Sequence, residues 1–267
     1  MTFTIKEIIE KALPVVREAG TFLKNEIYKV KITDIETKNI HDFVTYVDRS
    51  SEIILVNGLK KILPGSGFIT EEKTIQESKE KEFVWIIDPL DGTTNYIHKL
   101  PPYSISVALM QNGKLCGGII YEISHNEMFY AWQGGGAFLN GNGIKVSSTG
   151  KVFDSLIATG FPFKDYSRID RYMETLKYFM EHSLGLRRLG SAAVDLAYVA
   201  CGRFDAFYEY SLKPWDVAAG AFIVKEAGGK VCDFDGGENF LYGEEIIASN
   251  SAIHSEFLDT VKRFLEE

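Results

Sequence analysis

The sequence predicts an α/β protein with an α+β first half and an α/β second half. In the first half, helical patterns come early in the chain, and short alternating segments follow from about residue 103 to residue 146. Beyond residue 151, strand patterns and helix patterns alternate. This change of pattern predicts a domain boundary near residue 147, which divides the chain into residues 1–147 and residues 148–267.

Two amphipathic helices are expected in the first half. Residues 5–27 carry apolar side chains at helical spacing, and Pro14 is expected to weaken or kink this helix because it has no amide hydrogen. A second helix is expected at residues 48–63. Its N-cap is expected among Asp48, Ser50 and Ser51.

The rest of the first half is expected to form strands. Residues 83–87 are an unbroken apolar run bounded by charge, which is typical of a strand covered on both faces. An antiparallel meander is expected at residues 104–110, 114–121 and 128–132. The glycine-rich segments 134–136 and 140–143 match no nucleotide-binding fingerprint, so we interpret them as tight turns.

The second half is expected to alternate between strands and helices. Strands are expected at residues 156–159, 205–210, 230–233 and 245–248. Helices are expected at residues 171–181, 191–201, 217–227 and 255–265. Gly228 and Gly229 end the third of these helices, since glycine adopts the backbone conformation that follows a helix.

The composition argues against several classes of function. The 267 residues include 29 Lys and Arg against 37 Asp and Glu, and the net charge of −8 argues against nucleic acid as the default partner. The three cysteines form no C-x-x-C pair, which argues against a disulfide framework or a zinc site and favours a reducing, cytoplasmic compartment. No uncharged apolar run reaches the roughly 18 residues that span a bilayer, and the N-terminus does not resemble a signal peptide, so we expect no membrane partner.

Two carboxylates follow the apolar run at residues 83–87. Asp88 and Asp91 lie in the segment WIIDPLDGTTN, and the end of a buried strand is a rigid platform that can aim both at one point. Hard oxygen ligands of this kind suit Mg²⁺, and Gly92 and Thr93 are placed to begin a helix whose free amides face a phosphate. The alternative is that Asp-Pro and Asp-Gly only mark turns. The D-x-x-D spacing does not fit the D-x-D-x-T loop of aspartyl-phosphate phosphatases.

Two further acidic sites are weak when taken alone. Glu71 and Glu72 end another short apolar run, although adjacent glutamates are usually solvated surface. Asp216 lies near the start of an apolar helix, where an ordinary N-capping aspartate is the alternative.

Taken together and in this order, the acidic segments resemble the inositol monophosphatase family. Residues 85–95 resemble its first signature, W-I-D-P-[IL]-D-G-T-x-N, and residues 215–229 resemble its second, W-D-x-A-A-G…E-A-G-G. Residues 42–48 and 190–200 extend the resemblance, which spans roughly residues 5–250. By these motifs the chain is identified as a member of the family, of the bacterial inositol-1-monophosphatase type.

The resemblance implies the layered αβαβα sandwich of the inositol monophosphatase and fructose-bisphosphatase type. It also implies two or three bound Mg²⁺ ions, with Asp88 bridging two of them. The implied metal ligands are Glu71, Asp88, the carbonyl of Leu90, Asp91 and Asp216. Clustered carboxylates would repel a phosphate, whereas the same carboxylates loaded with Mg²⁺ attract it.

The resemblance further implies the reaction and the substrate. A metal-activated water, oriented by Glu71, Thr93 and Asp48, would hydrolyse a phosphate monoester of inositol or a similar small polyol or sugar without a covalent intermediate. The implied substrate-binding residues are Asp91, Gly92, Thr93, Gly190, Ser191, Ala192 and Glu209. Resemblance to lithium-sensitive members implies inhibition by Li⁺, and the relatives are commonly homodimers.

Two alternatives stay open. The same metal site serves fructose-1,6-bisphosphatases and phosphatases of nucleotide bisphosphates, so the resemblance does not fix the substrate. Some bacterial relatives bind the transcription machinery, so the alternative from another class is a partner of that machinery with secondary or vestigial phosphatase activity. The intact set of candidate catalytic and metal-binding residues argues against lost catalysis. This set is Glu71, Asp88, Asp91, Asp216 and Thr93.

Overall fold

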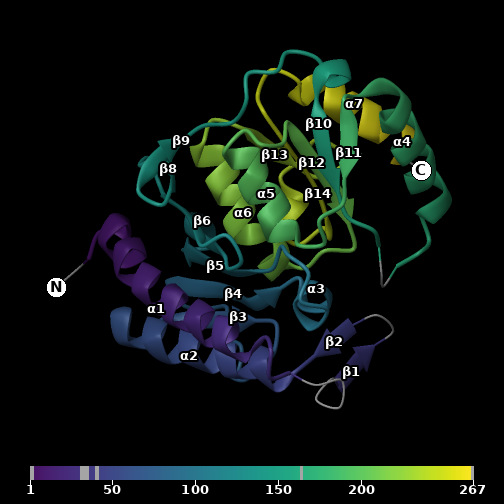
Figure 1. Ribbon diagram of the computed structural model, residues 1–267. Coiled ribbons are helices and arrows are strands. Elements are labelled where there is room, and N and C mark those ends of the chain that lie inside the picture. Colours follow the sequence, from purple (N-terminus) through teal and green to yellow (C-terminus); the bar gives the residue numbers. More distant parts are fainter. Residues whose placement is uncertain (1–2, 31–35, 40–41, 163–164, 266–267) are drawn as a thin grey trace.

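A computed structural model describes residues 3–30, 36–39, 42–162 and 165–265. Among these residues it has seven α-helices, a seven-stranded sheet, a five-stranded sheet and a two-stranded sheet (Figure 1). The helices are α1 (Ile5–Glu26), α2 (Tyr46–Ile62), α3 (Thr93–Ile97), α4 (Ile169–His182), α5 (Ala192–Ala200), α6 (Pro214–Glu226) and α7 (His254–Leu265). In the described part of the chain, no helix is long and apolar enough to cross a lipid bilayer.

The seven-stranded sheet follows the order of the chain. β3 and β4 pair in parallel, and the later neighbours pair antiparallel. Its strands are β3 (Gly67–Thr70), β4 (Phe83–Asp91), β5 (Ser104–Gln111), β6 (Lys114–Glu122), β7 (Glu127–Trp132), β8 (Gly136–Leu139) and β9 (Asn142–Ile144).

The five-stranded sheet has the order β11-β10-β12-β14-β13. β10 pairs in parallel with both neighbours, whereas β14 pairs antiparallel with β12 and β13. Its strands are β10 (Leu156–Thr159), β11 (Gly185–Arg187), β12 (Ala206–Tyr210), β13 (Lys230–Cys232) and β14 (Glu245–Ser249). The separate antiparallel pair is β1 (Glu36–Asn39) and β2 (Asp42–Val44).

Three hydrophobic clusters join these elements into five layers (Figure 1). α1 and α2 pack on one face of the seven-stranded sheet. α5 and α6 lie between the two large sheets, and α4 and α7 cover the outer face of the five-stranded sheet. This order is the αβαβα sandwich that the sequence implied, so the predicted fold class is confirmed.

The strands share their side chains between the layers with the two-residue period of a sheet. In β5, Val107 and Leu109 belong to the cluster under α1 and α2, whereas Ala108 belongs to the cluster that contains α5 and α6. The same division holds in β4, where Trp85 and Ile86 lie in different clusters. Because both faces are covered, these strands are near-continuous apolar runs in the sequence.

The predicted N-cap of the second helix is wrong. α2 begins at Tyr46, and its N-cap is Thr45, whose Oγ1 accepts a hydrogen bond from the Val47 amide at 3.2 Å. Asp48 lies three residues after the cap, and its Oδ2 accepts a hydrogen bond from the Thr45 amide at 2.8 Å. Thr45 and Asp48 therefore form a capping box, with the threonine as the N-cap and the aspartate three residues later. The sequence prediction was wrong because it placed the cap at the aspartate or later.

Several short strands were not expected from the sequence, and they include β1, β2 and β3. The glycine-rich segments contain β8 and β9 beside the expected turns, and β11 lies in a segment for which no strand was expected. Glycine has a low preference for strands, so β8, β9 and β11 form because they pair with neighbouring strands and not because of their local sequence. The first helix continues through Pro14 to Glu26.

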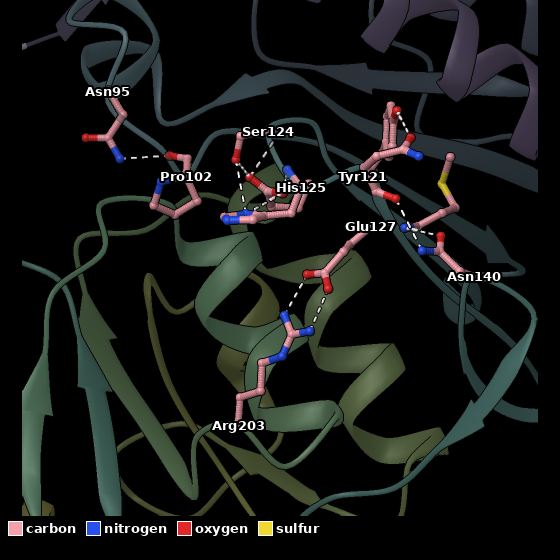
Figure 2. Close-up of polar contacts among 11 residues, drawn as sticks. Asn95, Pro102, Tyr121, Ser124, His125, Glu127, Asn140 and Arg203 are labelled. Carbon is pink, nitrogen blue, oxygen red and sulfur yellow. Dashed lines mark hydrogen bonds and ion pairs between the residues drawn. The ribbon is translucent and has the colours of Figure 1, made fainter.

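The expected boundary near residue 147 falls between β9 and β10. The hydrophobic cluster around α6 includes residues of both large sheets, so packing is continuous across this point. On the surface, Arg203 after α5 donates two hydrogen bonds to Glu127 in β7, at 2.6 and 2.5 Å (Figure 2). The division into two domains stays a prediction.

Candidate active site

A cavity of about 390 Å³ is lined by residues from both halves of the chain. The walls come from the end of β4, the first turns of α3, α5 and α6, and the strand β12. Of the residues expected at the site, all but Asp48 line this cavity. They are Glu71, Asp88, Leu90, Asp91, Gly92, Thr93, Gly190, Ser191, Ala192, Glu209 and Asp216. The fold thus brings together residues that are far apart in the sequence.

A β-bulge at the end of β4 aims two acids at the cavity. Asp88 pairs with Ser106 of β5 and Asp91 pairs with Ser104, so three residues of β4 lie opposite two residues of β5. Residues three apart on a regular strand point to opposite faces, and the extra residue restores the same face. Asp88 Oδ1 also accepts a hydrogen bond from the Leu90 amide at 2.9 Å, which fixes the bulge.

The acids repel one another in this buried place. Burial, and then the neighbouring carboxylates of Glu71, Asp91 and Asp216, raise the pKa of Asp88 well above its ordinary value. Burial also raises the pKa of Asp91 to about 6, although Ser191 and the Ala193 amide donate hydrogen bonds to it at 2.6 and 2.8 Å. A group of acids with such raised pKa values is stabilised in its charged form by a cation.

The donor set fits a hard divalent cation. It consists of carboxylate oxygens and the Leu90 carbonyl, which are the ligands that Mg²⁺ prefers. Within residues 3–30, 36–39, 42–162 and 165–265, no three His, Cys, Asp or Glu side chains already stand in the arrangement of a metal site. Asp216 instead accepts a hydrogen bond from the Lys213 amide at 2.6 Å at the start of α6. Joint coordination of one cation by these acids would therefore require some of their side chains to move.

A hydroxyl and a buried acid lie beside the bulge. Gly92 has a positive φ of 88° and precedes α3, so the chain turns sharply after Asp91. Thr93 Oγ1 lies 3.2 Å from Asp48 Oδ1 and 3.0 Å from the Leu90 carbonyl oxygen. Burial raises the pKa of Asp48, and the hydrogen bonds from Thr45 and Thr93 oppose this effect.

Glu52 was missed by the sequence analysis. It is fully buried on α2, and its carboxylate accepts hydrogen bonds from Thr70 Oγ1 at 2.9 Å, from the Glu72 amide at 2.8 Å and from the Thr74 amide at 2.7 Å. These bonds hold the segment on both sides of Glu71. The available signal was the spacing of two acids, Asp48 and Glu52, one helical turn apart on an amphipathic helix.

The start of α5 and the strand β12 supply further walls of the cavity. Ser191 is the N-cap of α5, and its Oγ accepts a hydrogen bond from the Val194 amide at 3.3 Å. Asn95 Nδ2 donates to the carbonyl group of Pro102 at 2.8 Å (Figure 2). It also donates to the carbonyl group of Leu189 at 2.8 Å, which ties α3 to the segment before Gly190. The loop at Gly190 is therefore fixed against the first half of the chain.

Glu209 lies within β12, and only 7% of it is exposed. Its carboxylate packs against Gly160, where an added Cβ would lie 2.0 Å from the carboxylate atoms. Burial, and then the charge of Asp216, raise the pKa of Glu209 well above its ordinary value, and Arg188 opposes this. Gly160 thus leaves the room that lets Glu209 line the cavity.

The fold and the cavity define a layered α/β protein with an acidic pocket lined by both halves of the chain. The chain belongs to the inositol monophosphatase family, whose model matches residues 4–266. It is 42% identical over 253 residues to a putative Nus factor SuhB of Neisseria meningitidis, a match that covers 95% of this chain and 97% of that one. It is 39% identical over 246 residues to an inositol-1-monophosphatase of Mesorhizobium japonicum, covering 92% of each chain.

The solved structures agree with this assignment. The extragenic suppressor protein suhB of Bartonella henselae superposes with a TM-score of 0.91 at 37% identity, covering 96% of this chain and 99% of that one. Membership of the family supports phosphatase activity. The relatives carry two kinds of name, so the substrate does not follow from the comparisons.

Proposed function

We propose that this protein is a Mg²⁺-dependent phosphatase that hydrolyses the monophosphate of inositol or of a similar small polyol or sugar. The observation that carries the proposal is the single cavity that Asp88, Asp91 and Asp216 share with Glu71 and Thr93. Repelling carboxylates and a hydroxyl held by a buried acid are the parts that metal-assisted phosphate hydrolysis needs.

The metal ligands in this proposal are the acids of the cavity. Glu71, Asp88 and the Leu90 carbonyl would hold one Mg²⁺, and Asp88, Asp91 and Asp216 would hold a second. When bound, Mg²⁺ would lower the pKa of water and neutralise the charge of the phosphate and of the departing alkoxide. The raised pKa values of Asp88 and Asp91 are the reason to expect that these two acids are not merely surface charge.

The chain's own groups orient the reactants. A threonine hydroxyl has one proton and can accept further hydrogen bonds. When the Thr93 hydroxyl donates its hydrogen bond to Asp48, its oxygen can still accept a hydrogen bond from the attacking water. Glu71 would also contact this water. The amides of Gly92 and Thr93 would donate hydrogen bonds to the phosphate and so fix its orientation without adding a charged group.

The wall formed by β12 and the start of α5 would receive the alcohol part of the substrate. Glu209 is buried and lines the cavity, and a carboxylate accepts hydrogen bonds from hydroxyl groups. The segment from Gly190 to Ala192 also lines the cavity and would provide backbone contacts. We therefore place the leaving group between Glu209 and Asp91.

The test of the proposal is phosphate release by the purified protein with Mg²⁺ across four substrate classes. These are inositol monophosphates, glycerol phosphates, fructose-1,6-bisphosphate and nucleotide bisphosphates. The proposal expects the highest kcat/KM for a compact polyol monophosphate. A preference for fructose-1,6-bisphosphate or a nucleotide bisphosphate would overturn the substrate and leave the metal chemistry standing.

Replacement of Glu209 with glutamine should weaken the preference for polyols. The variant keeps the shape of the side chain but loses charge-assisted hydrogen bonds, which costs on the order of 1.5–3 kcal/mol in transition-state binding. We expect the ratio of kcat/KM for inositol monophosphate to kcat/KM for an aryl phosphate without vicinal hydroxyls to fall. An unchanged ratio would remove Glu209 from the substrate site.

Lithium should inhibit the reaction. Resemblance to lithium-sensitive family members motivates this expectation, because Li⁺ would compete for one Mg²⁺ position. The measurement is a titration of LiCl against KCl at matched ionic strength, with inositol monophosphate as substrate. Equal effects of the two salts would reject specific inhibition.

A second candidate function comes from the names of the relatives. Proteins 37–42% identical to this chain are named Nus factor SuhB or putative Nus factor SuhB. We propose as the alternative that this chain binds the transcription machinery as well, as a homodimer. Binding of the purified protein to RNA polymerase, compared between wild type and a variant without phosphatase activity, tests whether this role is separate from catalysis.

A further inference from the structure

An aspartate in the first turn of α5 has no role in the function proposed above. Asp195 lines the cavity, and only 1% of it is exposed. Its Oδ1 is buried and has no hydrogen-bond partner. In the described part of the chain, four other buried side-chain polar atoms share this property, and they belong to Ser66, Trp85, Tyr208 and Tyr210. None of these four lines the cavity, and none is a carboxylate.

A buried carboxylate oxygen without a partner is unstable unless something supplies a donor. Burial, and then the charges of Glu209 and Asp91, raise the pKa of Asp195 well above its ordinary value, and Arg188 opposes this. Arg188 is solvent-exposed, and its guanidinium lies over the ring of Phe161 at 5.4 Å. Arg188 therefore donates no hydrogen bond to Oδ1, and this oxygen has no donor among the described residues.

A comparison within the chain shows how a buried aspartate is normally satisfied here. Asp205 is also buried, but its two oxygens accept hydrogen bonds from Ser147 Oγ at 2.5 Å and from the Leu156 amide at 2.7 Å. Asp195 receives a favourable partial charge from the start of α5, which lets it remain there without such partners. Asp195 also lines the cavity, so a group bound in the cavity is the available partner for its Oδ1.

We propose that Asp195 is a specificity-determining residue whose free Oδ1 accepts a hydrogen bond from a hydroxyl group of the substrate alcohol. Glu209 binds one hydroxyl and Asp195 binds another, so the cavity selects leaving groups that carry at least two. This inference rests on the proposed function, because it concerns the alcohol part of the same substrate. A neutral hydroxyl supplies the missing donor without adding charge to a site that already contains Arg188.

The test begins with stability. Asp195→Asn and, as a matched control at a partnered buried aspartate, Asp205→Asn are compared with wild type by thermal unfolding without substrate. Replacing an unpartnered buried carboxylate with a neutral amide should leave the melting temperature unchanged or raise it, whereas Asp205→Asn should lower it. A clear fall in the melting temperature for Asp195→Asn would show that Asp195 has structural partners, and it would overturn the inference.

The second part measures specificity. The ratio of kcat/KM for inositol monophosphate to kcat/KM for an aryl phosphate should fall about ten- to a hundredfold in Asp195→Asn. Asp195→Ala should give a similar fall. Among monodeoxy analogues of inositol monophosphate, the loss of one particular hydroxyl should lower the kcat/KM of wild type by a comparable factor. The same loss should lower the kcat/KM of Asp195→Asn only slightly. The effects of removing the two partners of one hydrogen bond are not additive.

Three outcomes separate the inference from its foundation. If wild type hydrolyses the aryl phosphate and does not prefer the inositol phosphate, the proposed function fails, and this inference fails with it. If wild type shows the preference and Asp195→Asn keeps it, the cavity holds only water at Asp195, and this inference alone is overturned. If removal of each hydroxyl lowers kcat/KM by the same factor in Asp195→Asn as in wild type, direct contact between Asp195 and the substrate is likewise rejected.

Discussion

Replacement of Asp88 with asparagine should remove nearly all phosphate release while the protein stays folded. Asp88 is the acid that the proposal assigns to both Mg²⁺ positions, and an amide is a weak ligand for a hard cation. We expect kcat/KM to fall at least about a hundredfold. Asp91→Asn and Asp216→Asn should have the same kind of effect. The measurement is phosphate release at saturating Mg²⁺.

The fold should survive the Asp88 substitution for two physical reasons. Asparagine keeps an oxygen that can accept the hydrogen bond from the Leu90 amide. It also removes the repulsion between a buried carboxylate at this position and the carboxylates of Glu71, Asp91 and Asp216. The matched control is Asp259→Asn, an exposed aspartate on α7, which should keep full activity. Wild-type turnover by Asp88→Asn, or an equal loss in Asp259→Asn, would contradict the proposed metal site.

Replacement of Thr93 with alanine should lower kcat about 10²- to 10⁴-fold and change KM far less. The hydroxyl is expected to orient the attacking water, an interaction made chiefly in the transition state. Thr93 also contacts the Leu90 carbonyl, but it is only partly buried, so the variant should unfold at nearly the wild-type temperature. Thr93→Ser keeps the hydroxyl and should retain most of the activity.

Asp48→Asn should reduce kcat similarly but should also destabilise the protein. Asp48 Oδ2 accepts hydrogen bonds from the amide and the hydroxyl of Thr45, at 2.8 and 2.7 Å, at the start of α2. An asparagine has one acceptor oxygen and cannot accept from both Thr45 and Thr93, so we expect the free energy of unfolding to fall by about 1 kcal/mol. If Thr93→Ala and Asp48→Asn both turned over at the wild-type rate, this pair would have no part in catalysis.

The layers of the fold could be predicted because their causes are local and periodic. The expected helix at residues 5–27 is α1, and the apolar run at residues 83–87 is the start of β4, since amphipathic and doubly covered elements leave clear patterns. β11 could not be predicted in this way. Its three residues form a strand only because β10 pairs with them, and that pairing depends on the whole sheet.

The sequence predicted most of the residues that line the candidate site, but it did not predict the residues and the β-bulge that hold them in place. Asp88 and Asp91 stood out because two acids end a buried strand, although the β-bulge that turns both to one face is not visible in the sequence. Glu52 was missed because its partners, such as Thr70, come from another element. Asp195 was missed for the opposite reason, since the property that marks it is the absence of a partner for a buried atom.

Metal removal tests the central claim most directly. Wild-type protein is treated with EDTA, loss of metal is confirmed by elemental analysis, and phosphate release from inositol monophosphate is measured before and after Mg²⁺ is returned. The proposed function predicts that release disappears in the metal-free protein and returns with Mg²⁺, because the carboxylates that line the cavity repel a phosphate unless cations occupy them. Undiminished release by the metal-free protein would contradict it.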